Sequence, residues 1–399
     1  MMTHKLFACA AAAVLLLGCM TGCSSDRQSS QDAIQNATDS TISGAYADII
    51  ERSLLSLGNT TQIRAAMDRA QNGNATIGFI GGSITEGMTA GGSDCYATCT
   101  YRYFQEHFAG NNQVQYVNAG LSGTSSVLGL LRAQKELFQY APDVIFIEFA
   151  VNDAQDEEHR IAYESLVKSC LNQPQQPAVV LVFTMLKDGY SCQEQMTKIG
   201  EAYQLPMISV GDALNPEFQL GRMQWSEYSD DSSHPNKFGH QLVASMISNY
   251  LEKAAVQPPA EESLPQTPVY GDGYMGATLV DLSGVTSLGS FEPRSFSQLF
   301  DRGYAAKADG TAQPLSFTVT GKKLFLVYTA QNSADWGIAG VYVNDRLVST
   351  VSANSKNGWG GPAVVLAYES DTPQEMHVQL SMLQEQESKQ FQLLGVGIQ

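Results

Sequence analysis

A serine, a histidine and an aspartate occur where they can act together as a nucleophile and its base. Ser83 lies in Gly81-Gly82-Ser83, directly after an apolar run, and the glycines allow a sharp turn that exposes the hydroxyl. Asp231 and His234 lie three residues apart, so the carboxylate can reach the imidazole. A serine hydroxyl needs a base, and the base needs an acid that fixes its tautomer. Read alone, each motif also fits a common structure, a strand-to-helix turn or a helix cap.

The other histidines are weaker candidates for the base. Only His234 follows an expected strand with an acid at close spacing. The remaining five lie in the leader, in expected helices or polar stretches, or in the C-terminal part: His4, His107, His159, His240 and His377. We expect His240 on the surface of a helix.

Two further segments follow expected strands and can stabilise negative charge. Gly123 ends Asn118-Ala-Gly-Leu-Ser-Gly123, and Asn152 lies in Ala150-Val-Asn152-Asp153. The backbone N–H groups of Ser83 and Gly123, with the Asn152 amide, can point at the oxyanion that forms during acyl transfer. Taken singly, Gly123 and Asn152 also fit ordinary turns. We interpret Asp153 as a structural hydrogen-bonding residue.

The elements around these motifs alternate between strands and helices. Apolar runs predict strands at 75–80, 114–117, 143–149, 178–185 and 206–210. Helical spacing predicts helices at 49–67, 127–140, 161–171 and 235–254, the last with Pro235 in its first turn. This alternation predicts a parallel sheet covered on both faces, with the chemistry beyond the carboxyl ends of the strands.

The order of these motifs resembles the SGNH (GDSL-like) hydrolase superfamily, over roughly residues 74–254. The resemblance implies a three-layer α/β/α flavodoxin-like fold. It also implies a serine esterase in which Ser83 is the nucleophile, His234 the base and Asp231 its orienting acid. Ser83 N–H, Gly123 N–H and the Asn152 side chain would form the oxyanion hole. No cofactor and no metal are implied.

The chain departs from the family pattern at two places. The common Gly-Asp-Ser is Gly81-Gly82-Ser83 here, and the common Gly-x-Asn-Asp begins with Ala150. The acid of Gly-Asp-Ser is not a triad member, so its replacement leaves the expected activity intact. Asp230 is adjacent to Asp231 and can compete for the histidine, but the family spacing favours Asp231.

The N-terminus resembles a bacterial lipoprotein signal. Leu6–Leu17 is an apolar run of twelve residues, too short to cross a bilayer and typical of a signal-peptide core. We expect a signal peptide over 1–22, lipidation at Cys23 and a flexible tether over 23–45. Cys19, with leucine three residues before it, is the alternative. The protein is then exported and attached to the membrane through a lipid anchor.

The composition argues against nucleic acid as a partner. The formal net charge is −17, and an acidic surface repels phosphate backbones. Four cysteines remain in the body of the chain, and export favours disulfides such as Cys95–Cys99 and Cys170–Cys192. Spacing alone leaves their pairing open. A zinc site is not expected, because His107 is the only histidine near the first pair.

The chain divides into two folded domains. We expect the hydrolase domain over 46–255, a proline-rich linker over 256–268, and an all-β sandwich or jelly-roll domain over 269–399. Within the last, 341–348 predicts a hairpin with Asn344-Asp345 at the turn. Trp336 and Trp359 lie in glycine-containing segments of this domain. Each can stack on a sugar ring or fill the end of the sandwich, so carbohydrate binding stays a hypothesis.

These patterns lead to one main expectation and two alternatives. We expect an exported ester hydrolase whose substrate is an O-acetylated polysaccharide, on the analogy of SGNH domains joined to β-sandwich modules. A lipase, lysophospholipase or thioesterase using the same triad is the first alternative. A catalytically silent glycan-binding lipoprotein is the second.

Overall fold

A computed structural model describes residues 44, 46–258, 260 and 267–399. Residues Tyr46–Gln399 form one compact unit. The expected signal peptide, with Cys19 and Cys23, and all of the tether except Gly44 lie outside the described residues. In the described part, none of the helices has the length and apolar character needed to cross a membrane.

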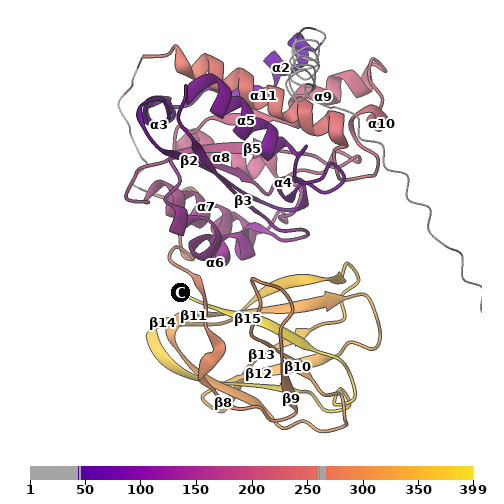
Figure 1. Ribbon diagram of the computed structural model, residues 1–399. Coiled ribbons are helices and arrows are strands. Elements are labelled where there is room, and N and C mark those ends of the chain that lie inside the picture. The colour runs from indigo at the N-terminus through magenta and orange to yellow at the C-terminus, as the bar shows by residue number, and fades with distance from the viewer. Residues whose placement is uncertain (1–43, 45, 259, 261–266) are drawn as a thin grey trace, which may run out of the picture. The chain divides into compact units, whose positions relative to one another are not determined.

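The N-terminal domain is built on a central sheet surrounded by helices (Figure 1). Among the described residues this sheet has six strands, in the order β1-β6-β5-β4-β2-β3. Strands β2 to β6 are parallel, and β1 pairs antiparallel with β6 at the edge. Taken by themselves, the parallel strands have the flavodoxin-like order 2-1-3-4-5. The strands are β1 Leu54–Ser56, β2 Ala75–Gly81, β3 Val114–Gly120, β4 Val144–Glu148, β5 Ala178–Phe183 and β6 Met207–Ser209.

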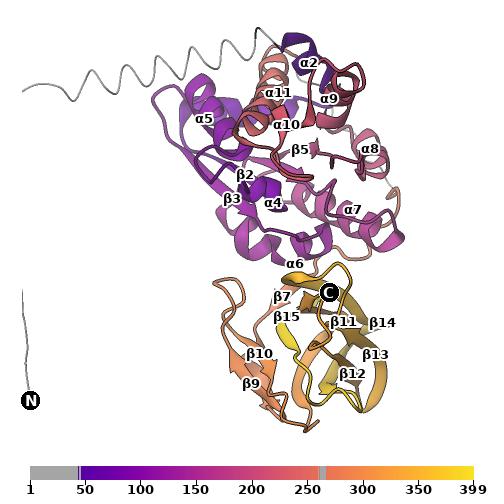
Figure 2. The same cartoon turned by 90° about the vertical axis from the view of Figure 1, so that its right-hand side faces the viewer.

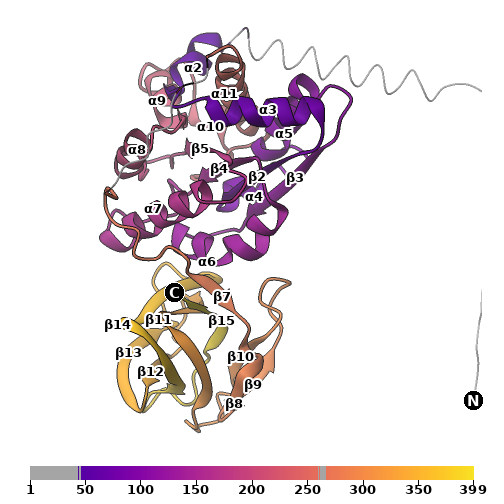
Figure 3. The same ribbon diagram turned by 90° about the vertical axis from the view of Figure 1, so that its left-hand side faces the viewer.

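Helices cover both faces of this sheet. Figure 3 shows α3, α5 and α11 on one side and α6 and α7 on the other. The helices are α2 Ala47–Arg52, α3 Thr61–Asn72, α4 Ser83–Glu86, α5 Tyr96–Phe108, α6 Ser126–Glu136, α7 Glu157–Leu171, α8 Gln193–Ala202, α9 Val210–Gln219, α10 Trp225–Tyr228 and α11 Lys237–Ala255. The three-layer α/β/α fold expected from the sequence is confirmed.

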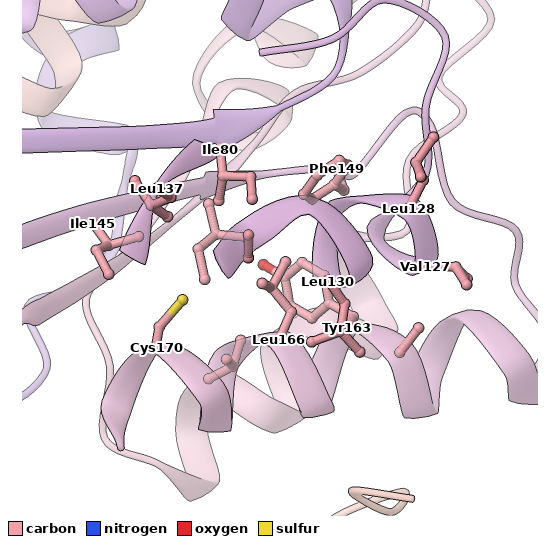
Figure 4. Close-up of a cluster of buried hydrophobic side chains, with 14 of the residues drawn as sticks. Ile80, Val127, Leu128, Leu130, Leu137, Ile145, Phe149, Tyr163, Leu166 and Cys170 are labelled. Carbon is pink, nitrogen blue, oxygen red and sulfur yellow. The ribbon is translucent and has the colours of Figure 1, made fainter. Parts of the chain in front are cut away.

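A buried apolar layer joins the sheet to α6 and α7. Every residue of β4 is buried, so this central strand is apolar on both faces except for its last residue, Glu148. Leu130 on α6, Leu166 on α7 and Phe149 after β4 meet in one cluster (Figure 4). Such packing holds the carboxyl ends of the strands, and the loops after them, in fixed positions.

Two helix predictions need correction. The helix expected over 49–67 is interrupted, because α2 ends at Arg52 and residues from Leu54 pair with β6 as a strand. Helix α11 begins at Lys237, not at Pro235. Pro235 instead forms a bridge with Ser229, and the Asn236 side chain caps the helix by accepting from Gly239 N at 2.9 Å.

The C-terminal domain is all β and antiparallel, as expected. Its described strands follow the order β13-β12-β14-β11-β15-β10-β9, and β8 pairs with β11. Strand β7 lies beside β15 (Figure 2). The hairpin prediction is confirmed, since Asn344 and Asp345 join β12 and β13 with φ of 50° and 63°. The strands are β7 Thr278–Val280, β8 Val285–Ser287, β9 Phe291–Arg294, β10 Gly303–Ala306, β11 Leu315–Gln331, β12 Ile338–Val343, β13 Arg346–Ser352, β14 Trp359–Met382 and β15 Gln392–Ile398.

The disulfides considered from the sequence do not form. Cys95, Cys170 and Cys192 carry free thiols, which excludes both a 95–99 and a 170–192 bridge. Cys170 lies in the apolar layer between α7 and the sheet (Figure 4). The Cys192 thiol is directed to the carbonyl oxygen of Asp153 at 3.1 Å.

Candidate active site

The residues singled out from the sequence gather beyond the carboxyl ends of the strands. Ser83 follows β2 and begins α4, Gly123 follows β3, and Asn152 follows β4. Asp231 and His234 come from the loop between α10 and α11. In the flavodoxin-like order, β2 lies between β3 and β4, so the chain leaves it at the point where the direction of winding reverses. Ligand sites of open α/β sheets lie at this point.

Ser83, His234 and Asp231 form a continuous hydrogen-bonded chain. Ser83 Oγ lies 2.9 Å from His234 Nε2, and His234 Nδ1 lies 2.7 Å from Asp231 Oδ2. Asp231 Oδ1 also accepts from the backbone N–H groups of Ser233 and His234, each at 2.6 Å. Burial opposes ionisation of Asp231, but hydrogen bonds from His234 and Ser233 outweigh it and lower the pKa of the carboxyl. The acid is therefore charged and oriented at neutral pH.

Two residues that sequence reasoning missed support this loop. The Trp225 indole N–H donates to the carbonyl oxygen of Asp231 at 2.6 Å. The buried Ser229 hydroxyl lies 3.0 Å from the same oxygen. Asp230, the competing acid, instead contacts Asn236 Nδ2 at 3.4 Å. Neither Trp225 nor Ser229 belongs to a recognisable motif, so only the folded loop shows their contacts.

The glycine in place of the family's aspartate has a steric reason. A Cβ on Gly82 would lie 2.2 Å from Asn152 Oδ1, closer than atoms can approach. The backbone of the nucleophile turn therefore runs directly against the Asn152 amide. Asn152 Oδ1 is buried and has no hydrogen-bond partner among the described residues. Contact with Gly82 therefore orients this side of the amide.

The loop that carries Gly123 is fastened to the nucleophile turn. Leu121 N donates to Gly81 O at 3.1 Å, and Ser122 N donates to Glu86 Oε2 at 2.8 Å. Gly123 itself has φ of 67°, a left-handed conformation that a side chain disfavours. Its N–H is therefore presented from a loop fixed to α4 and β2.

Arg132 on α6 is a buried cation under this loop, and no sequence motif marks it. Its guanidinium donates to Gly81 O at 2.9 Å and to Ala119 O at 2.7 Å, at the ends of β2 and β3. It also pairs with Glu136 at 2.7 Å. Burial lowers the pKa of Arg132, while Glu136 favours the charged form. Arg132 thus ties together the two strands that deliver Ser83 and Gly123.

Two buried acids and a buried histidine lie behind the site. Glu148 accepts from Thr184 at 2.6 Å, and burial raises its pKa to about 7. Asp153 accepts from Ser126 N at 2.7 Å, and burial raises its pKa to about 6. His240 is fully buried, which corrects the expected surface position, and accepts from Tyr96 N at 3.1 Å. Burial lowers its pKa to about 4, so it serves as a neutral structural acceptor.

The two tryptophans considered from the sequence have different surroundings. Trp336 packs against the apolar core of the β domain. Trp359, the first residue of β14, is 59% exposed, yet its indole adjoins Gly123, where a Cβ would lie only 2.4 Å from the ring. A cavity of about 220 Å³ lies here, lined by Gly123 and Asn152 from one domain and by residues 355 and 357–359 among others from the second. The second domain therefore contributes to the surroundings of the site.

Among the described residues, no group of three His, Cys, Asp or Glu side chains is arranged to hold a metal ion. The polar groups at the site fit an acyl-transfer centre: a candidate nucleophile, a candidate base, a candidate orienting acid and candidate donors for an oxyanion.

Comparison with known proteins agrees with this geometry. The model of the GDSL-like Lipase/Acylhydrolase family matches residues 79–242. No curated protein matches the sequence significantly. The chain is similar to a crystal structure of a two-domain esterase (CEX) active on acetylated mannans, co-crystallized with mannopentaose. It is 27% identical, with a TM-score of 0.77 over 88% of this chain and 97% of that one.

A second crystal structure of a two-domain esterase (CEX) active on acetylated mannans gives 28% identity. Its TM-score is 0.76 over 88% of this chain and 98% of the other. Both similarities extend over the α/β and the β domain. Residues 79–242 therefore match the GDSL-like lipase/acylhydrolase family, and the protein is a carboxylic ester hydrolase.

Proposed function

We propose that this protein is an exported, lipid-anchored serine esterase that removes O-acetyl groups from a polysaccharide, with acetylated mannan as the first candidate. The observation that carries the catalytic part is the hydrogen-bonded chain from Ser83 through His234 to Asp231. Gly82, next to Ser83, packs against Asn152, and the loop that carries Gly123 is hydrogen-bonded to Gly81, so both candidate oxyanion donors adjoin the turn that carries Ser83.

The reaction follows from these contacts. Ser83 Oγ attacks the ester carbonyl carbon while His234 Nε2 takes its proton, and Asp231 stabilises the imidazolium. The carbonyl oxygen gains negative charge and accepts from Ser83 N–H, Gly123 N–H and the Asn152 amide. His234 then protonates the departing sugar oxygen, which leaves an acetyl-enzyme. Water attacks this intermediate with His234 again as base, and release of acetate restores Ser83.

The β domain supports a glycan as the alcohol part of the ester. Trp359 presents an exposed indole next to Gly123, and flat aromatic faces suit the apolar faces of sugar rings. The similar two-domain esterases are described as active on acetylated mannans, and one was co-crystallized with mannopentaose. Trp336 is a weaker candidate for stacking, because it packs against the β core.

The proposed membrane attachment rests on the N-terminal sequence. The apolar run Leu6–Leu17 followed by Gly22-Cys23-Ser24 supports lipidation at Cys23, with Cys19 as the alternative. Mass spectrometry of the mature N-terminal peptide from membranes tests this assignment. A diacylated peptide that starts at Cys23 supports it, whereas an unmodified mature N-terminus contradicts the anchor.

The catalytic proposal is tested by acetate release from 4-nitrophenyl acetate and from acetylated mannan, with wild type beside Ser83→Ala. We expect the wild type to hydrolyse both and the variant to hydrolyse neither at a measurable rate. Activity retained by Ser83→Ala would exclude Ser83 as the nucleophile. A preference for octanoyl over acetyl esters would favour a lipase, and sugar binding without hydrolysis by wild type would favour a binding protein.

A further inference from the structure

The segment that enters the β domain is fastened to helix α7 by a buried carboxylate. Glu164 lies on α7 and is fully buried. Its Oε1 accepts from Val269 N at 2.6 Å and from the Tyr203 hydroxyl at 2.9 Å. Its Oε2 accepts from Tyr270 N at 2.6 Å and from Gly271 N at 3.0 Å. Three consecutive backbone N–H groups thus surround one carboxylate, an arrangement that binds anions.

Further contacts continue along the same helix. Arg160 lies over the Tyr270 ring, 5.4 Å from its centroid, one turn before Glu164. Ser165 Oγ accepts from Tyr274 N at 3.2 Å, and Lys168 pairs with Asp272. We call residues 269–274 together with these α7 side chains the α7 dock. The dock begins directly after the expected linker, so the first residues of the β domain are fastened to α7.

The β domain contacts the α/β domain at the α7 dock and again where Trp359 adjoins Gly123. In addition, Phe325, Val327 and Leu394 of the β domain share one apolar cluster with α6. Helix α6 begins at Ser126, three residues after Gly123. The β domain therefore packs on the helix that follows the Gly123 loop, which we call the oxyanion loop. A displacement of the β domain along α6 and α7 would therefore move Trp359 relative to Gly123.

We propose that Glu164 is a positioning residue for glycan substrates, because it sets where Trp359 lies against the oxyanion loop. This inference rests on the proposed function for its substrate but not for its structural part. The triad and the donors lie wholly in the α/β domain, so small esters need no correctly placed Trp359. A polymeric substrate that contacts both domains does need it. Loss of the Glu164 charge should thus separate the two activities.

The test compares the full-length wild type with Glu164→Gln. Glutamine keeps the shape but replaces one acceptor oxygen by an NH2 group, which cannot accept from the backbone N–H groups. We expect kcat/KM for acetylated manno-oligosaccharides to fall about tenfold, mostly through KM, a change that corresponds to about 1.4 kcal/mol. The rate on 4-nitrophenyl acetate should stay within about twofold. Glu157→Gln, an exposed position in the first turn of α7, is the matched control and should change neither. Equal losses on both substrates, or no loss on either, would contradict the proposal.

Hydrogen exchange provides a readout that does not depend on the substrate. In Glu164→Gln, backbone amides of 269–274 should exchange faster, and those of the Trp359 segment, 355–362, should do so as well. Faster exchange confined to 269–274 would overturn the positioning role even if wild type proves inactive on mannan. Lys168→Met weakens the α7 dock at its more exposed ion pair and should give smaller shifts in the same two segments. It takes the place of Glu164→Gln if that variant does not fold.

Discussion

The candidate catalytic residues and Trp359 are held at the same site by different kinds of contact. Ser83, His234 and Asp231 are joined by hydrogen bonds of 2.7–2.9 Å inside the α/β domain. Trp359 comes from the β domain and adjoins Gly123 by packing while remaining 59% exposed. The hydrogen bonds fix the positions of the side-chain atoms that would take part in the reaction. The exposed indole of Trp359 instead offers an apolar surface for a substrate. Under the proposed function, the α/β domain carries out the reaction and the β domain contacts the alcohol part of the substrate.

The largest expected effect lies on the catalytic side. Asn152→Ala removes one proposed oxyanion donor, so kcat should fall by roughly 10²–10³-fold on small esters and on glycans alike. Steady-state kinetics on both substrates measures this, with thermal unfolding to confirm that the variant is folded. An unchanged kcat would remove Asn152 from the mechanism and weaken the distinction between the two regions.

A smaller and selective effect is expected on the recognition side. Trp359→Ala should lower kcat/KM for acetylated manno-oligosaccharides by about tenfold, corresponding to about 1.4 kcal/mol, and leave 4-nitrophenyl acetate within about twofold. Leu347→Ala, which removes another exposed apolar side chain of the β domain, is the control and should have no effect. Equal losses on the two substrates would show that Trp359 acts on the chemistry and not on substrate choice.

The smallest expected effect concerns stability and belongs to the α/β domain alone. Burial raises the pKa of Glu148 to about 7, so the unfolded state loses this proton at a lower pH than the folded state does. The contribution of Glu148 to stability is therefore present at about pH 4 and is lost as the pH rises toward 7. His240, whose pKa is lowered to about 4, works in the opposite direction.

The Glu148→Gln variant isolates the contribution of the carboxyl. Urea unfolding of wild type and variant between pH 4.5 and 7.5 should show the wild type losing stability relative to the variant as the pH rises. A difference that stays constant over this range would mean that Glu148 does not titrate there.

Much of the α/β domain was predictable because apolar periodicity depends on burial. The run 75–80 corresponds to β2, and 178–185 contains β5, since both are buried on two faces and contain few polar residues. Apolar spacing predicts a helix where the edge strand β1 lies, because Leu54 and Leu55 continue the spacing of α2. Their pairing partner, β6, is about 150 residues away in sequence. Long-range pairing of this kind leaves little local signal.

The site was predictable where a motif exists and not where only contacts exist. Ser83, Asp231 and His234 were found by order and spacing, and the structure brings them together. Arg132 looked like an ordinary helix residue, because its role depends on the carbonyl groups of two strands. His240 was misplaced, because a single histidine on a helix carries no mark of the side that faces Tyr96.

The α7 dock has a consequence for recombining such enzymes. A β domain moved onto another hydrolase would lose Arg160, Glu164, Ser165 and Lys168, which remain with the α/β domain. The exchangeable module is therefore larger than the β fold itself and includes one face of a helix about 100 residues earlier in the chain. A chimera that is joined at the proline-rich segment should therefore also receive these four side chains. Without them, the transplanted β domain would lose its contacts with α7.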